Sequence, residues 1–445
     1  LEHEALDDPR VAGPLRERYV FWEADVDAAP RWMDLPGVSG LPTLVFFDAK
    51  GRHVLTRSGY REPPALATLL EVTADRIDAG ELEPYRPRPT SRLADETMTA
   101  TEAAAELDRL EKQLFLKVNS NDGGFETPSR QPHPRLLLEL QRWREVDGPE
   151  RLDDWIRLTV ESALRGTSPR LRGEPKPAMD FTADELRELS RVGAEAGERW
   201  REGIEQLPTI DPYLGIQDQY DHGVFRYAAG PGWYHPHFER LAIDNIAWSM
   251  LLERRGNAEA SERIWSYVID TFEKDGLLRT SQASNPFYYR LRREERETLE
   301  PPDVGELIRP DVQALATFID SSRCPTLLRV EANAWPKSQW TTAAVDDSSS
   351  DATADLVGEL LIALVNCDTN DHRELADKLV SLVTERWETK GLPKTARLFR
   401  LAAGVCAARA ELCPRALATI EGMELELDYP PPLVALQSVA DRNHR

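Results

Sequence analysis

The residues best suited to chemistry lie in one short stretch of the chain, between positions 218 and 245. This stretch contains Asp218, the run Phe225-Arg226-Tyr227 and the run Trp233-Tyr234-His235-Pro236-His237-Phe238-Glu239, and it ends at Asp244-Asn245. Aromatic rings line ligand pockets and can stack on the C–H face of a sugar, and a carboxylate beside an imidazole can share the roles of acid and base. The composition therefore predicts a pocket for a carbohydrate or a similar polyhydroxylated ligand.

A role can be predicted for each of these side chains. We expect Glu239 to act as acid or base with His237 as its partner, and Asp244 to join them in the catalytic group. Pro236 favours the first position of a helix, which would place His237 and Asp244 on one helical face. These groups should converge at one mouth of the fold. The predicted ligand contacts are Arg226, Tyr227, Trp233, Tyr234 and Asp218, together with Phe125 from the turn at residues 121–125.

A simpler interpretation stays open for each of these residues. The histidines and arginines could hydrogen-bond loop carbonyls at a helix start, and the aromatic rings could belong to the core. A metal site built from Asp221, His235 and His237 lacks a diagnostic ligand spacing. The sequence therefore predicts neither a metal ion nor a cofactor.

Helical hairpins must position this stretch, because helix follows helix from about residue 98 to the end of the chain. Three hairpins are clear, at residues 134–164, 238–273 and 354–388. Each joins an apolar helix to an amphipathic helix through a short polar turn. At about 28–30 residues per helix and loop, residues 98–445 hold on the order of twelve helices. This number favours a closed all-α (α/α)6 toroid over an open solenoid.

The N-terminal part has a different organisation. Residues 1–85 combine helical patterns at 1–18 and 64–79 with short strand patterns at 19–26, 44–48 and 53–57. These patterns predict a small α/β domain. Residues 86–97 begin with closely spaced prolines among charged residues, which is typical of a linker. The predicted domains are therefore 1–85 and 98–445.

Composition excludes several partners. The chain has 445 residues and a net charge of −22, which opposes binding to nucleic acid or anionic lipid. No apolar run approaches the length of about 18 residues that spans a bilayer. The four cysteines, Cys324, Cys367, Cys406 and Cys413, are scattered and lack metal-binding spacing. They favour buried free thiols in a reducing compartment, and hence a cytoplasmic protein.

The run Gly37-Val38-Ser39-Gly40-Leu41-Pro42-Thr43, followed by an apolar strand, resembles the thioredoxin superfamily. The resemblance implies that Pro42 follows a cis peptide bond and faces a redox dithiol. The chain contains no cysteine before Cys324. We therefore expect the thioredoxin-like domain to lack its first strand and CxxC motif here, and the sequence to begin just downstream of where that motif would lie.

Nearly the whole chain resembles the family of spermatogenesis-associated protein 20. Phe225-Arg226-Tyr227, Trp233, Pro236-His237-Phe238-Glu239 and Asp244-Asn245 match its signature in order, and Glu2-His3-Glu4 and Asp122-Gly123-Gly124-Phe125 fit it too. The resemblance implies a thioredoxin-like domain joined to a toroid of the glycosidase and sugar 2-epimerase kind. The acidic loop of the family corresponds to residues 277–290, which contain no carboxylate.

Three functions are compatible with the sequence. In the first, the toroid binds or processes a small sugar-like ligand. In the second, the protein acts in thiol-disulfide exchange or as a thiol chaperone, with the toroid docking substrates and the thioredoxin-like domain binding a protein partner. The third is a non-catalytic scaffold. Fold class alone does not choose among them, because both folds host many activities.

Overall fold

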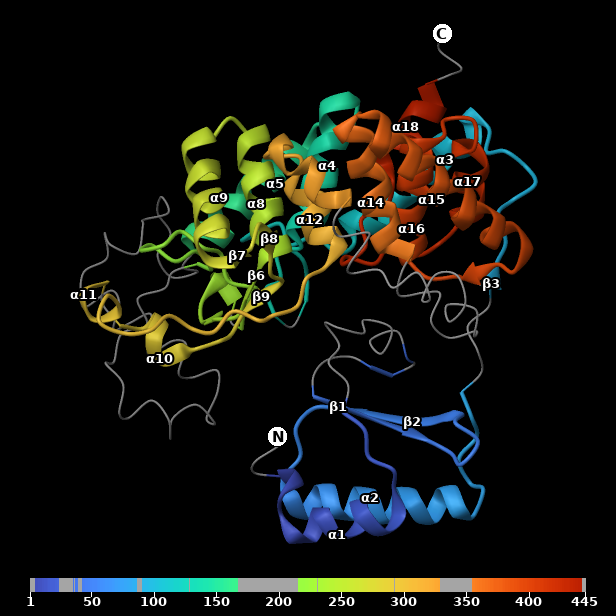
Figure 1. The fold of residues 1–445 in the computed structure, drawn as a ribbon. Helices are drawn as coiled ribbons and strands as arrows, with labels where there is room; N and C mark the ends of the chain where they lie inside the picture. The colour runs from blue at the N-terminus through green and yellow to red at the C-terminus, as the bar shows by residue number, and fades with distance from the viewer. Residues whose placement is uncertain are drawn as a thin grey trace. The chain divides into compact units, whose positions relative to one another are not determined.

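The structure is a computed structural model that describes residues 5–23, 35, 37–38, 42–85, 90–127, 129–166, 215–229, 231–291, 293–328 and 354–441. The chain divides into two compact units. The first reaches to Thr90, and the second holds the described residues from Ser91 onward. Figure 1 shows the two units, of which the second is built almost entirely from helices.

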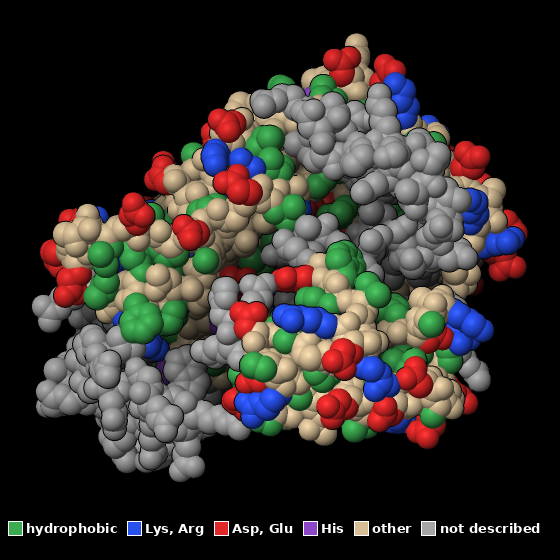
Figure 2. Space-filling view, turned by 60° about the horizontal axis from the view of Figure 1, so that its bottom comes forward, with side chains coloured by type: hydrophobic (Ala, Val, Ile, Leu, Met, Phe, Trp, Pro, Cys, Tyr) green, Lys and Arg blue, Asp and Glu red, His purple; other side chains and the backbone are tan. Residues whose placement is uncertain are grey.

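The first unit contains a two-stranded hairpin and two helices. Helix α1 (Pro9–Arg18) packs on α2 (Pro63–Asp78), and β1 (Thr43–Phe47) pairs antiparallel with β2 (His53–Ser58). The Asp48 carboxylate closes the turn by accepting hydrogen bonds from two backbone N–H groups of residues 50 and 52. Apolar side chains from all four elements form its small core. On the viewed face of the molecule, acidic and basic side chains are interspersed (Figure 2).

The thioredoxin-like features of this unit are present only in part. Strands predicted at 44–48 and 53–57 form at Thr43–Phe47 and His53–Ser58. Residues 19–23 form no strand, and residues 24–26 lie outside the described part of the chain. Pro42 directly precedes β1, and its carbonyl accepts a hydrogen bond from the Gly59 N–H at 2.8 Å. Leu41 is not described, so the cis bond predicted before Pro42 stays a prediction.

The second unit has a ring of inner helices. These are α4 (Pro134–Val146), α8 (Ala242–Arg254), α12 (Pro310–Ala316), α14 (Ala354–Cys367), α16 (Arg397–Ala408) and α18 (Leu433–Ala440). Each of the first four packs on the next, α17 (Cys413–Ile420) joins α16 to α18, and α18 returns to α4. The described helices therefore close into a ring.

Outer helices cover this ring. They are α3 (Ala100–Phe115), α5 (Arg151–Arg165), α9 (Ala258–Phe272), α15 (Asn370–Thr389) and α17, which pack on α18, α4, α8, α14 and α16 in turn. The inner helix α8 is buried on all sides, with Ile246, Trp248 and Leu251 fully inaccessible. The outer helix α9 has one apolar face instead. This arrangement is the hairpin architecture that the periodicity predicted.

Short elements complete the description. Strand β3 (Thr90–Ser91) lies at the boundary of the two units. The strands of the second unit are β4 (Tyr227–Ala228), β5 (Pro236–His237), β6 (Arg240–Leu241), β7 (Glu273–Lys274), β8 (Leu277–Leu278), β9 (Ser281–Gln282) and β10 (Leu392–Pro393). The short helices are η5 (Pro231–Trp233), α10 (Pro286–Tyr289), α11 (Arg293–Arg296) and η6 (Ser321–Arg323).

The inner helices begin at one end of the ring. Asp355 and Arg397, at the starts of α14 and α16, form an ion pair of 2.9 Å. At the opposite end, Glu145 near the end of α4 pairs with Arg254 at the end of α8. We call the end where the inner helices start the N-terminal mouth and the opposite end the C-terminal end.

All four cysteines are paired. Cys324 bonds to Cys367 and Cys406 bonds to Cys413, with Cα–Cα distances of 5.7 and 4.2 Å. The prediction of buried free thiols is therefore wrong, because the ring brings together cysteines that the sequence separates. The pairing also removes the reason for expecting a reducing compartment. Within the described residues, no helix is both long and apolar enough to cross a membrane.

Candidate functional site

The candidate stretch folds into paired loops before α8 instead of a helix that starts at Pro236. Strand β4 pairs antiparallel with β5, which sets Tyr227 opposite His237, and β6 pairs with β9. Helix α8 begins only at Ala242. The helix predicted from Pro236 was wrong, because these backbone groups bond to neighbouring strands and His235 has a positive φ of 55°. His237 and Asp244 therefore do not share a helical face.

Three of the predicted residues form one contact group. The Arg226 guanidinium donates a hydrogen bond of 2.7 Å to the Glu239 carboxylate. The His237 Nδ1 atom lies 3.9 Å from the same carboxylate. The His237 ring stacks on Tyr227, with ring centroids 4.6 Å apart and an angle of 12° between planes. All four side chains retain some solvent exposure, so they can meet a ligand.

A second group of charges lies at the N-terminal mouth. His133, which precedes α4, contacts the Asp428 carboxylate through Nδ1 at 3.0 Å. Arg135 donates to the Asp428 backbone carbonyl at 3.1 Å. The charges of Arg135, Arg226, His133 and Asp428 all act on Asp244 in the first turn of α8. Arg226, which contacts Glu239 directly, therefore also acts on both aspartates through its charge.

The pKa values of the two aspartates are shifted in opposite directions. Burial raises the pKa of Asp244, and the nearby cations only partly offset it. Desolvation also acts to raise the pKa of Asp428, although 70% of its side-chain surface is exposed. The hydrogen bond with His133 and the charges of His133, Arg135 and Arg226 outweigh that effect and lower the pKa of Asp428. Such a pair can supply one protonated and one ionised carboxyl group.

The pKa values of His237 and Tyr227, whose rings stack on each other, are also shifted. Burial lowers the pKa of His237, with Glu239 opposing and Arg226 reinforcing the shift. Burial likewise raises the pKa of Tyr227. His237 is therefore neutral near neutral pH, and it can donate or accept a hydrogen bond.

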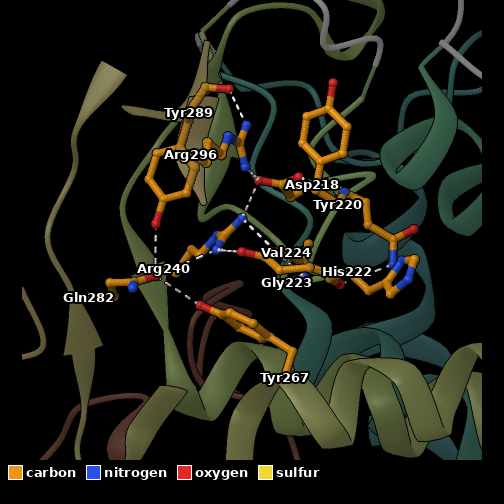
Figure 3. A network of polar contacts seen from close by, with 12 residues as sticks. Asp218, Tyr220, His222, Gly223, Val224, Arg240, Tyr267, Gln282, Tyr289 and Arg296 are labelled. Atoms are coloured by element: carbon orange, nitrogen blue, oxygen red, sulfur yellow. Dashed lines mark hydrogen bonds and ion pairs between the residues drawn. The ribbon is translucent and has the colours of Figure 1, made fainter. Parts of the chain in front are cut away.

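Asp218 belongs to a buried network behind the mouth loops (Figure 3). Its side chain is fully inaccessible and binds Arg240 at 2.8 Å and Arg296 at 2.6 Å. Arg240, also fully inaccessible, pairs with Asp221 at 2.7 Å and packs against aromatic rings, with Tyr289 at 4.4 Å. This network fixes the loop to β6 and α11. The ligand contact predicted for Asp218 does not fit this placement.

Two predicted aromatic contacts are also interior. Trp233 and Phe125 have no exposed surface. The Trp233 indole N–H donates to the Asp122 carbonyl at 2.8 Å, and its ring covers Gly124, where a Cβ atom would lie 2.7 Å from it. Both rings therefore hold the loops together and offer no face to a ligand. Tyr234, by contrast, is half-buried.

His133, Arg135 and Asp428 were not predicted from the sequence. Each stands just before or at the start of an inner helix, at α4 or α18. In a ring of parallel inner helices, all such positions meet at one mouth. Polar residues that precede predicted inner helices were the signal that could have found them. No group of three His, Cys, Asp or Glu side chains within the described residues could hold a metal ion.

Comparisons with known proteins give a weak likeness to carbohydrate-active enzymes. No family model and no curated protein matches the chain. A solved α-amylase from Clostridium perfringens aligns with a TM-score of 0.39 and 9% identity, over 77% of this chain and 96% of its own. The α-1,6-mannanase GH76A of Salegentibacter sp. HEL1_6 has a TM-score of 0.30 and 10% identity, over 71% and 99%. An unsaturated glucuronyl hydrolase specific for heparin has a TM-score of 0.32 and 10% identity, over 72% and 96%. Scores this low assign neither substrate nor activity to the chain.

Proposed function

We propose that the N-terminal mouth binds a sugar-like polyhydroxylated ligand and processes it by acid–base catalysis. The observation that carries this proposal is the contact group of Arg226 with Glu239 beside the Tyr227–His237 stack, whose Arg226 charge also acts on the Asp244 and Asp428 carboxyl groups. Carbohydrate sites combine stacking rings with charged groups that hydrogen-bond hydroxyls. Asp244 lies in the first turn of α8, and the pairing of β4 with β5 holds Tyr227 and His237 against each other.

The pKa directions suggest which carboxyl group does what. Asp244, whose pKa is raised, would donate a proton to a leaving oxygen. Asp428, whose pKa is lowered, would stay ionised and act as base or nucleophile. Glu239, predicted from the sequence as the acid or base, is held by Arg226, and we now assign it to positioning Arg226 and His237. His237 would hydrogen-bond a ligand hydroxyl.

The test begins with a panel of mono- and oligosaccharides screened by thermal shift, followed by calorimetry and product analysis. Asp244→Asn should keep ligand affinity and lose about 100-fold or more of turnover. Glu239→Gln should weaken binding instead. The matched control is Asp154→Asn on α5, an exposed residue paired with Arg157. Failure of every saccharide to bind, or full turnover by Asp244→Asn, would refute the assignment.

We further propose that residues 1–85 are a thioredoxin-like unit and that the chain is a divergent relative of the spermatogenesis-associated protein 20 family. The strand pairing of β1 with β2 after Pro42 supports the first part. Because all four cysteines are bonded within the second unit, this chain should not reduce insulin disulfides above background. Robust reduction that depends on its cysteines would contradict that expectation and favour the thiol-exchange alternative.

A further inference from the structure

A cavity of about 500 Å³ lies at the C-terminal end of the ring, away from the residues proposed above. It is lined by α4, α8, α14, α16 and α18. The charged residues of its lining are Arg142, Arg254 and Arg400 with two glutamates. The apolar residues of its lining include Ile362, Ala403 and Val439. A volume of this size suits a small organic molecule.

Most charges in this cavity already have close partners. Arg254 pairs with Glu145, and Arg400 pairs with Glu359 at 2.7 Å. Glu139 lies 3.8 Å from both Arg142 and Arg400, which is too far for a hydrogen bond. Its single negative charge is therefore shared between two guanidinium groups.

Arg142 is the cation that remains under-compensated. Its side chain is 19% exposed, and among the described residues it has no hydrogen-bond acceptor, only Glu139 at 3.8 Å and the Phe318 ring at 5.6 Å. Burial lowers the pKa of Arg142, and the charges of Arg400 and Arg254 add to that effect against Glu139 and Glu359. A guanidinium presents five N–H donors, so this half-buried side chain keeps donors that a ligand in the cavity can meet.

Arg400 gives a second, independent observation. Its side chain is 5% exposed and lines the same cavity, yet its Nε–H has no hydrogen-bond partner among the described residues. Buried polar groups without partners are uncommon and usually mark a missing acceptor. Arg142 and Arg400 both approach Glu139, so one acceptor could serve both.

We propose that this cavity binds a small organic carboxylate with an apolar tail. The carboxylate accepts hydrogen bonds from Arg142 in the bidentate geometry that guanidinium groups favour. The tail lies against the Ala403 and Val439 side of the cavity. The site is distinct from the saccharide site, because none of the residues proposed for that site lines this cavity.

Octanoate is the probe, titrated into the full chain by calorimetry, with octanol as its uncharged analogue. Octanoate should bind and octanol should bind much more weakly. Arg142→Gln should lower octanoate affinity about tenfold or more. Arg144→Gln on the same helix, where Arg144 pairs with Asp153 at 2.9 Å, is the matched control and should change nothing. Circular dichroism checks that each variant is folded.

Further variants keep the proposal testable if Arg142→Gln fails to fold. Ala403→Leu fills the apolar side and should shorten the longest fatty acid that binds, in a series from butanoate to decanoate. Asp244→Asn, at the other mouth, should leave octanoate affinity unchanged. The proposal is overturned if wild-type protein does not bind octanoate, if octanol binds equally well, or if neither Arg142→Gln nor Ala403→Leu changes binding.

Discussion

At the scale of single residues, the charged side chains of one short stretch of sequence occupy two different environments. Arg226, His237 and Glu239 meet on a partly exposed surface, whereas Asp218 and Arg240 pair in the interior. Both groups come from the same run of sequence. Side-chain type does not separate them, because a buried ion pair and a ligand site use the same chemistry. The local backbone decides which side chain goes where: His237 lies in β5, paired with β4, and Arg240 lies in β6, paired with β9.

We expect Arg240→Met to lower the free energy of unfolding of the helical unit by about 3–5 kcal/mol. The substitution removes the guanidinium that pairs with both Asp218 and Asp221, so the buried Asp218 carboxylate loses one of its two arginine partners. Urea unfolding followed by circular dichroism measures the effect. Arg157→Met, which breaks the exposed pair with Asp154, is the control and should cost less than about 1 kcal/mol. A loss as small as that of the control would show that the network adds little stability.

Stability should also fall in mild acid. Burial lowers the pKa values of His53, His222 and His237 in the folded protein. As the pH falls below about 6.5, these histidines become protonated in the unfolded chain before they do so in the folded protein. The stability that the neutral histidines contribute is therefore lost as the pH drops through their folded pKa values. His237→Gln should reduce the slope of stability against pH in this range. Urea midpoints at about pH 7.5 and about pH 5.5 measure it, and an unchanged slope contradicts the assignment.

At the scale of elements, hydrophobic periodicity predicted the hairpins well. The helices expected at 134–145 and 354–366 begin at the predicted residues and end one residue later, at Val146 and Cys367. The start of α8 was misplaced, because two-residue strand pairs leave no periodic signal in a sequence. The cysteine pairs were missed for a similar reason: the sequence carries no record of which outer helix lies beside which inner helix.

Helices α14 and α16 approach so closely that glycine is required at their crossing. A Cβ atom on Gly358 would lie 2.1 Å from the Arg400 backbone oxygen. Gly358→Ala should therefore separate the helices and lower the free energy of unfolding by about 1–3 kcal/mol, or more if the ring cannot adjust. The helical Gly13 has nothing within 4 Å of its Cβ position. Gly13→Ala, in the first unit, should leave the unfolding of the helical unit unchanged when both are followed by thermal denaturation.

At the scale of the whole molecule, the helical unit separates two kinds of polar chemistry along its ring. The end where the inner helices begin holds Asp244, Asp428 and Arg226. The end where they finish holds Arg142 and Arg254. Between them, Arg400 and Glu359 are buried partners. A ring of parallel helices gives each end its own set of side chains, so one unit can hold two independent sites.

The two disulfides should stabilise the helical unit against unfolding to different extents. The Cys324–Cys367 bond spans 43 residues and joins the segment after α12 to the end of α14, whereas Cys406–Cys413 spans 7 residues. Loop-closure entropy in the unfolded chain predicts about 4 kcal/mol for the first and about 2 kcal/mol for the second. Cys324→Ser/Cys367→Ser should therefore lower the urea midpoint more than Cys406→Ser/Cys413→Ser.

Thiol titration of the unfolded wild-type chain tests the premise of that comparison. Without reductant it should show no reactive thiol, and after reduction it should show all four cysteines. Thiols that react before reduction would show that the cysteines are free, and would restore the reducing compartment expected from their spacing. The titration could show no reactive thiol before reduction while the two double variants unfold at the same urea concentration. In that case the disulfides stabilise the protein through local packing and not through the length of the loop that each closes.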